Sequence, residues 1–319
     1  MTLISDAVCL EASPEMATVQ AWLNAARPRT LPLAFSAILT GGSLAWSHGQ
    51  FRWPVFALSM VTAVLLQILS NFANDFGDFS KGADSQHRVG PARTMQSALI
   101  SKREMTAAIV TTVALTLVAG YALLAISIRE KASGVFLLFV LLGLLAVAAA
   151  IFYTVGRRPY GYHGYGDVSV FLFFGLTGVA GSFYLHANGL EPEVLLIASA
   201  VGLLSTGVLN INNMRDSESD RLAGKRTLVA RIGIPWAKRY HAGLVIGALF
   251  FAATYTVMVG ASVSVRLLIL SPFVLLAKNA ADIFRNTNPS SFDKYLARQV
   301  GFTLLFALLF GAGTLLNGL

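Results

Sequence analysis

Long apolar stretches, separated by short charged segments, follow one another along most of the chain. Eight of these stretches contain no Asp, Glu, Lys or Arg, and a ninth, from Leu267 to Ala281, is interrupted by Lys278. Because a helix needs about 20 apolar residues to cross about 30 Å of hydrocarbon, we predict an all-α polytopic membrane protein with about nine transmembrane helices. The eight uninterrupted stretches cover residues 30–51, 53–74, 105–128, 132–156, 168–190, 194–214, 240–265 and 299–319.

The composition agrees with this pattern. Of the 319 residues, 55% are hydrophobic and 13% are charged, whereas soluble domains carry about 25% charged residues. A soluble enzyme, a secreted disulfide scaffold and a disordered chain are therefore excluded. Residues 1–20 contain no lysine or arginine, unlike a secretory signal. We predict a mobile tail over residues 1–20 and a single transmembrane domain over residues 21–319.

The positive charges are distributed unevenly between the predicted connections. When nine helices alternate in direction, 20 of the 24 lysines and arginines fall on the side of the N-terminus. Positive residues accumulate on the cytoplasmic side of membrane proteins, so we predict a cytoplasmic N-terminus. The net charge of +8 then reflects membrane topology, and the predicted partner is a lipid bilayer and no nucleic acid.

Glycines recur in the fifth predicted helix. Small residues let a neighbouring helix backbone approach closely, so a tight helix–helix seam is favoured over a ligand role. The glycines stand at every third position, at Gly175, Gly178 and Gly181.

Two acidic segments end the second and sixth predicted helices. A spacing of four residues places side chains on one helical face. Carboxylate and amide oxygens that converge in this way suit Mg²⁺, which completes its octahedron with waters and substrate phosphate oxygens. The side chains with this spacing are Asn74 and Asp78 in the first segment, and Asn212, Asp216 and Asp220 in the second.

The two acidic segments resemble copies of one unit, near residues 71–93 and 209–231. In each, an apolar helix ends in an Asn/Asp face and is followed by a basic loop. A duplicated helical unit would set two acidic faces opposite each other across a cavity. An offset of 138 residues relates Asn74 to Asn212, Asp78 to Asp216, and Arg93 to Arg231.

Cations stand directly beside the acids. A site for metal alone would not need them, but a metal-bridged diphosphate would, because Arg and Lys bind the phosphate oxygens that the metal leaves free. The alternative is that they are ordinary anchors on the cytoplasmic side. The candidate diphosphate-binding residues are Lys81, Arg88, Arg93, Lys225 and Arg226.

These motifs carry a resemblance to a known family. In the matching segments the chain resembles the UbiA superfamily of intramembrane prenyltransferases, and more narrowly its 1,4-dihydroxy-2-naphthoate branch in menaquinone synthesis. Five residues separate Asp78 from Asp84, a longer spacing than the superfamily's usual one, and this fits the naphthoate branch. The matching segments are 26–32, 74–91, 153–154, 158–162, 164–167 and 212–227.

The resemblance implies both a fold and a reaction. The helices would surround a central chamber in the bacterial cytoplasmic (inner) membrane, with the active site on the cytoplasmic side. A polyprenyl group would pass from polyprenyl diphosphate to 1,4-dihydroxy-2-naphthoate with loss of CO₂ and diphosphate, giving demethylmenaquinone. Mg²⁺ would be the cofactor, and the residues implied to bind it are Asn74, Asp75, Asp78, Asp84, Asp216 and Asp220.

Further residues are candidates for the aromatic substrate. Tyr153 ends the fourth predicted helix at the depth of the acids, where its ring could stabilise an allylic cation. Arg157, Arg158 and His163 follow it and could bind an anionic acceptor, although His163 could also be a surface histidine. The role of Arg27 and that of Asp167 stay open. The candidate catalytic residues are Asp78, Tyr153, Asp216 and Lys225.

Two alternatives remain. The same chemistry could prenylate another aromatic acceptor, such as 4-hydroxybenzoate. A transporter of a divalent cation or phosphate compound is the alternative from another class, but it predicts acids near mid-membrane on broken helices. Both acidic segments lie instead at helix ends on one side, which favours a one-sided reaction chamber.

Overall fold

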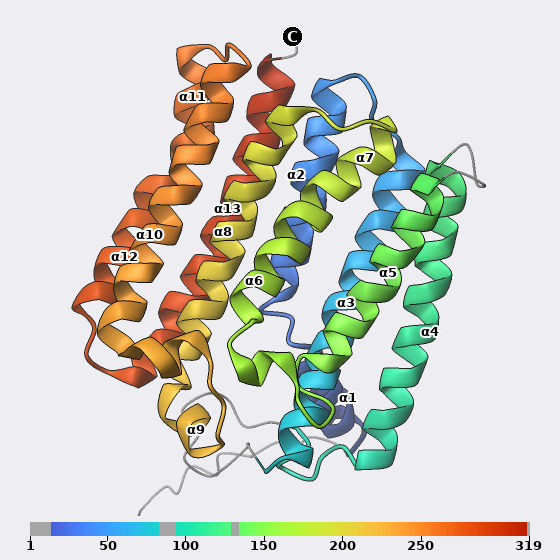
Figure 1. Ribbon diagram of the computed structural model, residues 1–319, viewed down its shortest axis with the longest axis vertical. Helices are drawn as coiled ribbons and strands as arrows, with labels where there is room; N and C mark the ends of the chain where they lie inside the picture. The colour runs from blue at the N-terminus through green and yellow to red at the C-terminus, as the bar shows by residue number, and fades with distance from the viewer. Residues whose placement is uncertain (1–13, 83–93, 129–133, 318–319) are drawn as a thin grey trace, which may run out of the picture.

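The computed structural model describes residues 14–82, 94–128 and 134–317, and the regular structure in these residues is helical (Figure 1). The helices are α1 (Pro14–Ala26), α2 (Leu31–Ser47), α3 (Trp53–Ser80), α4 (Lys102–Ser127), α5 (Gly134–Phe152), η1 (Tyr160–His163), α6 (Gly166–Val170), η2 (Phe171–Gly181), α7 (Ser182–Ala187), α8 (Pro192–Arg215), α9 (Ser217–Leu222), α10 (Leu228–Met258), α11 (Val263–Leu270), α12 (Pro272–Arg285), η3 (Pro289–Ser291) and α13 (Phe292–Asn317). Elements η1 and η3 are 3₁₀ turns, and η2 is a π-helix.

The predicted pattern of nine apolar helices is present. In the described part of the chain, eight helical segments are long and apolar enough to cross a membrane. Two of them are composite: α6, η2 and α7 form Gly166–Ala187, and α11 with α12 forms Val263–Arg285. Helix α2 is apolar but shorter, with 17 residues. The prediction of an all-α membrane protein with about nine helices is confirmed.

The helices extend beyond the charge-free stretches. Helix α3 continues to Ser80, so the first acidic motif lies within its last turns. Helix α10 begins at Leu228 rather than near residue 240, and Gly233 (φ 77°) and Pro235 kink its first part. Helix α1 begins at Pro14, so the end of the predicted tail is helical, and residues 1–13 of that tail lie outside the described residues.

Helix α8 lies in the interior of the bundle, between η2, α10 and α13 (Figure 1). Of its apolar span, 72% is buried, and Ile197 and Leu204 belong to a core that also holds Phe183, Phe306 and Phe310. Helix α5 is the opposite case, because only 11% of its apolar span is buried. The second acidic motif is thus at the end of the most enclosed helix.

The predicted glycine seam lies between η2 and its neighbours. A Cβ on Gly175 would be 2.6 Å from the Ala198 carbonyl oxygen and 2.8 Å from Gly202 Cα in α8. A Cβ on Gly178 would be 2.9 Å from Ala37 Cβ in α2. Close approach is therefore confirmed at these two glycines, whereas Gly181 has no heavy atom within 3.8 Å of such a Cβ.

The two ends of the bundle differ in chemistry. Helices α1 and α9 lie at one end, and α11 and the end of α13 lie at the other (Figure 1). Between α2 and α3, at the end that α11 shares, Phe51 contacts Trp46 and Trp53, and both tryptophans are exposed. Exposed tryptophans are typical of a membrane–water interface. The acidic motifs are at the opposite end.

Candidate active site

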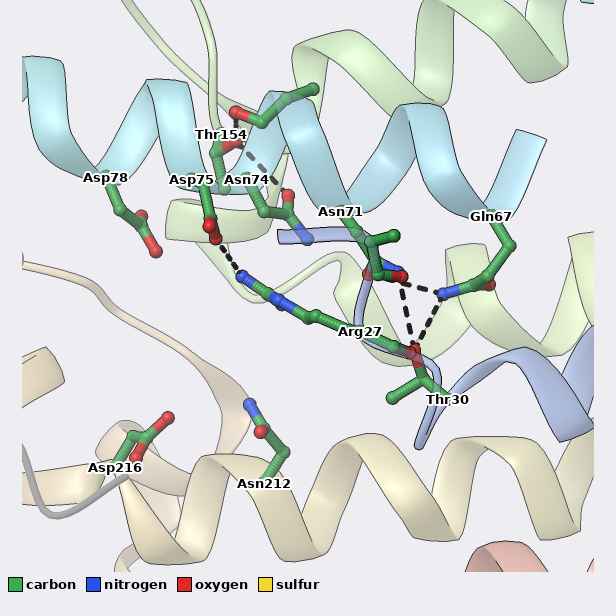
Figure 2. Close-up of polar contacts among 12 residues, drawn as sticks. Arg27, Thr30, Gln67, Asn71, Asn74, Asp75, Asp78, Thr154, Asn212 and Asp216 are labelled. Atoms are coloured by element: carbon green, nitrogen blue, oxygen red, sulfur yellow. Dashed lines mark hydrogen bonds and ion pairs between the residues drawn. The ribbon is translucent and has the colours of Figure 1, made fainter. Parts of the chain in front are cut away.

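A cavity of about 590 Å³ connects the acidic motifs with the apolar interior. At its polar end, side chains of α3 and α8 point into one space from opposite walls (Figure 2). Its remaining wall is apolar and includes Leu66, Leu117, Leu142, Phe173 and Leu185. The predicted convergence of the two acidic faces is present, and the residues that carry it are Asn74, Asp78, Asn212, Asp216 and Asp220.

Asp78 is a deeply buried carboxylate of the first motif, with 1% of the residue exposed. Its Oδ1 accepts a hydrogen bond from the Tyr162 hydroxyl at 2.8 Å and pairs with Lys225 Nζ at 2.8 Å. One turn earlier, Asn74 Oδ1 accepts from Thr154 Oγ1 at 3.2 Å. Both side chains are therefore held by residues from other elements, with their oxygens at the cavity wall.

Asp75 points to a different partner. Its carboxylate is ion-paired with the Arg27 guanidinium, which lies on the cavity wall (Figure 2). Arg27 has a positive φ of 51° and closes the turn between α1 and α2. Asn71 secures this turn, because its Nδ2 donates to the Ala26 carbonyl at 2.8 Å. Asp75 thus positions Arg27 and does not itself line the cavity.

The second motif is organised by Arg215. The guanidinium binds Asp216 through two hydrogen bonds, of 2.8 and 2.7 Å, and Nη2 also donates to Asn212 Oδ1 at 2.8 Å. Asp216 directly follows α8 as its C-cap residue, and Asp220 lies in α9. Burial raises the pKa of Asp220 to about 6, and the nearby Lys225 charge partly opposes this shift.

Lys225 links the two motifs. Its Nζ lies 2.8 Å from Asp78 and 3.5 Å from Asp220, and 4.9 Å from the centre of the Tyr162 ring. Its backbone N–H donates to the Asp220 carbonyl at 2.8 Å, which fixes the turn after α9. The next residue, Arg226, donates its backbone N–H to the Tyr162 carbonyl at 2.8 Å. A cation from the second unit thus reaches the first.

Two of the other predicted cations, Lys81 and Arg226, are not brought to the cavity. Lys81 is exposed and lies 5.2 Å from the Tyr162 ring, and the Arg226 side chain is exposed. Neither residue is on the cavity wall. Asp84, Arg88 and Arg93 lie outside the described residues.

Tyr153 is on the cavity wall, as predicted, and packs edge-on against Tyr160 at 5.3 Å between ring centres. Burial raises the pKa of its hydroxyl, which therefore stays neutral. The three candidates for the aromatic substrate that follow it have exposed side chains away from the cavity. They are Arg157, Arg158 and His163.

Several cavity residues were not assigned by sequence reasoning. Tyr162 and Arg27 stand in segments that carry the family resemblance, so a signal for them existed. Arg215 is adjacent to a motif acid, but nothing in the sequence indicates its partner Asp293 in α13, at 2.6 Å.

Asp167 is buried in the first turn of α6 and is not on the cavity wall, which agrees with a role at that helix N-terminus.

The donor set fits a hard cation that is shared with a substrate. In the described ranges, no group of three or more Asp, Glu, His or Cys side chains could hold a metal ion by itself. The cavity instead presents carboxylate and amide oxygens on two facing walls, with Lys225 between them. Mg²⁺ accepts few protein carboxylates and takes its other ligands from water and phosphate.

The comparisons with known proteins agree with this geometry. A model of the UbiA prenyltransferase family matches residues 34–306. The chain belongs to the UbiA prenyltransferase family. Within the family, it is similar to the 1,4-dihydroxy-2-naphthoate octaprenyltransferase of Escherichia coli K12, with 47% identity over 95% of this chain and 97% of that protein. The enzyme of the same name from Haemophilus influenzae is 42% identical over 93% of this chain and 96% of that protein.

Solved structures of UbiA homologs share the fold. A homolog from Aeropyrum pernix K1 aligns with a TM-score of 0.63 at 16% identity, over 97% of this chain and all of that one. A homolog from Archaeoglobus fulgidus bound to DMAPP and Mg²⁺ aligns with a TM-score of 0.56 at 17% identity, over 90% of this chain and 99% of that one. The UbiA architecture is thereby shown for this chain.

Proposed function

We propose that the protein transfers a polyprenyl group from polyprenyl diphosphate to 1,4-dihydroxy-2-naphthoate, with loss of CO₂ and diphosphate, giving the dihydroxy (quinol) form of demethylmenaquinone. The observation that carries the proposal is the cavity that joins two acidic motifs and Lys225 to an apolar chamber. A lipid diphosphate has this same division into a charged head and an apolar tail. The similarity to naphthoate octaprenyltransferases supports the choice of acceptor.

The polar end of the cavity would bind the diphosphate. Mg²⁺ would supply Lewis-acid stabilisation of the negative charge that develops on the leaving diphosphate. Lys225 would donate hydrogen bonds to phosphate oxygens, since its ammonium already lies between carboxylates of both motifs. The residues that would hold the metal are Asn74, Asp78, Asn212, Asp216 and Asp220.

The apolar part of the cavity would protect the reacting carbon. Breaking the allylic C–O bond leaves a carbocation that water would capture, so water must be excluded. Leu66, Leu117 and Phe173 line this part of the cavity and would surround the polyprenyl chain with hydrocarbon. The neutral Tyr153 ring is on the cavity wall and would stabilise the cation by a cation–π contact of up to about 2 kcal/mol.

The acceptor carboxylate requires a cation on the cavity wall. Arg157, Arg158 and His163 are exposed away from that wall. Among the described residues that line the cavity, the cations are Arg27 and Lys225. Because Lys225 is placed for the diphosphate, we assign the acceptor carboxylate to Arg27, which Asp75 orients.

The proposed setting is the bacterial inner membrane, with the active site on the cytoplasmic side. The positive residues support this orientation, because most of them belong to the end that holds the acidic motifs. The location of both motifs at one end also disfavours a transporter, which needs its binding site near mid-membrane.

The test replaces one carboxylate of each motif. Asp78→Asn and Asp216→Asn are expected to lower Mg²⁺-dependent pyrophosphate release from octaprenyl diphosphate and naphthoate by about 100-fold or more. Asp282→Asn is the control, since it removes an α12 carboxylate that pairs with Arg298 at 3.2 Å and is not on the cavity wall. Undiminished release by either motif variant would contradict the proposed roles.

A further inference from the structure

Helix α13 contributes a carboxylate to the second acidic motif, although it carries no motif of its own. Asp293, in the first turn of α13, accepts a hydrogen bond from Arg215 Nη1 at 2.6 Å. The Arg215 side chain is 7% exposed and the Asp293 side chain is 38% exposed. A buried guanidinium at the end of α8 thus reaches a carboxylate that lies 78 residues later in the chain, on another helix.

The other edge of the same guanidinium is hydrogen-bonded to residues that we propose as metal ligands. Nε and Nη2 of Arg215 donate to both oxygens of Asp216, and Nη2 also donates to Asn212 Oδ1. Paired bonds of this type between guanidinium and carboxylate are strong. Arg215 and a divalent cation would therefore compete for the same oxygens.

We propose that Asp293 is a positioning residue that shares Arg215 with Asp216 and so keeps the Asp216 carboxylate available to a divalent cation. The inference rests on the proposed function, in which Asp216 holds Mg²⁺. With Asp293 present, the three charges leave a net negative charge, whereas Arg215 and Asp216 alone would neutralise each other. A divalent cation is attracted to the net negative charge of the three groups, but not to a neutral pair of Arg215 and Asp216.

Asp293 would also keep the Arg215 guanidinium paired after the metal binds. When Asp216 turns an oxygen toward a metal ion, the guanidinium loses part of its pairing. A buried charge without a partner is costly. The bond to Asp293 lies on a different nitrogen, Nη1, and is not affected by that change. Arg215 can thus remain paired in both situations.

The experiment measures binding of Mn²⁺ alone to the full-length protein in detergent, by the loss of the free-ion EPR signal. Asp293→Asn is expected to weaken Mn²⁺ affinity about tenfold, as for coupled charges in one network. Asp293→Glu keeps the charge and should restore the affinity. Asp282→Asn is the matched control on the neighbouring helix α12, and should leave it unchanged.

A second background separates positioning from general structural damage. In Arg215→Met, no guanidinium competes for Asp216, so adding Asp293→Asn should cause no further loss of Mn²⁺ affinity. Thermal unfolding without metal checks that each variant is folded, and the comparison of Asp293→Asn with Asp293→Glu decides the matter if Arg215→Met does not fold. Equal affinity of Asp293→Asn and wild type overturns this inference alone. Absence of Mn²⁺ binding by the wild type overturns the proposed metal site as well.

Discussion

Asp78 takes its partners from parts of the chain that are distant in sequence. Tyr162 in η1 donates to its carboxylate, and Lys225 after α9 pairs with it, both at 2.8 Å. A hydrogen bond to a charged group contributes about 1.5–3 kcal/mol. The charge and direction of the central carboxylate of the first motif therefore depend on the η1 connection and on the second motif.

This dependence gives a prediction for Tyr162. Tyr162→Phe removes the donor but keeps the ring that Lys225 contacts. We expect kcat/KM for prenyl transfer to fall about tenfold, equivalent to about 1.4 kcal/mol, because Asp78 loses an orienting hydrogen bond. Steady-state assays against Tyr165→Phe, an exposed tyrosine of the same connection, provide the comparison. Equal kcat/KM for the two variants would refute a role for the hydroxyl.

Helix periodicity explains why sequence reasoning could group the side chains of the acidic motifs. The four-residue spacing of Asn74 and Asp78 fixes their common face once the helix is known, and Asn212 and Asp216 follow the same rule. Arg157 could not be placed in this way, because no periodicity sets the direction of side chains in an irregular connection. The Asp293 contact was not predictable either, since it depends on how α13 packs beside α8.

At the scale of elements, the seam between η2 and α8 supports the second motif. Gly175 and Gly202 let the two backbones approach until a Cβ would have no space. Charge-free stretches predicted each of these helices well, because hydrocarbon length sets their extent. They underestimated α10, where Arg231, Lys238 and Arg239 lie inside the helix near its polar end. A search for charge-free stretches cannot include the first turns of a membrane helix when those turns contain charged residues.

Gly175→Ala tests the seam. The added methyl would lie 2.6 Å from the Ala198 carbonyl oxygen, so backbone must move, and we expect a loss of about 1–3 kcal/mol of stability. Thermal unfolding in detergent should show a lower Tm. Gly243→Ala is the matched substitution at an exposed position of α10 with no atom within 4 Å of the new Cβ. If both variants unfolded at the same temperature as wild type, the close packing at this seam would not contribute to stability.

The whole molecule is polarised between its two ends. The acidic motifs and most cations are at the end that contains α9 (Figure 1), and the exposed Trp46 and Trp53 flank the connection between α2 and α3 at the other end. The cavity extends from the first end into apolar helices. This polarity fits a substrate whose head remains near one membrane surface while its tail enters the hydrocarbon region.

The orientation of the bundle can be measured with single cysteines. Cys9→Ser removes the chain's one cysteine. In that background, Ser264→Cys at the start of α11 should react with a membrane-impermeant maleimide added outside intact cells, and Thr287→Cys between α12 and α13 should react only after the cells are opened. The reverse pattern would place the acidic motifs outside the cytoplasm.

The central claim is that this cavity joins a polyprenyl group to 1,4-dihydroxy-2-naphthoate. The most direct measurement incubates the purified protein with octaprenyl diphosphate, Mg²⁺ and acceptor labelled in its carboxyl group. We predict the quinol form of demethylmenaquinone, pyrophosphate and labelled CO₂ in equal amounts, all absent when EDTA removes the metal. Prenylation of 4-hydroxybenzoate but not of the naphthoate, or no pyrophosphate release with either acceptor, would contradict the account.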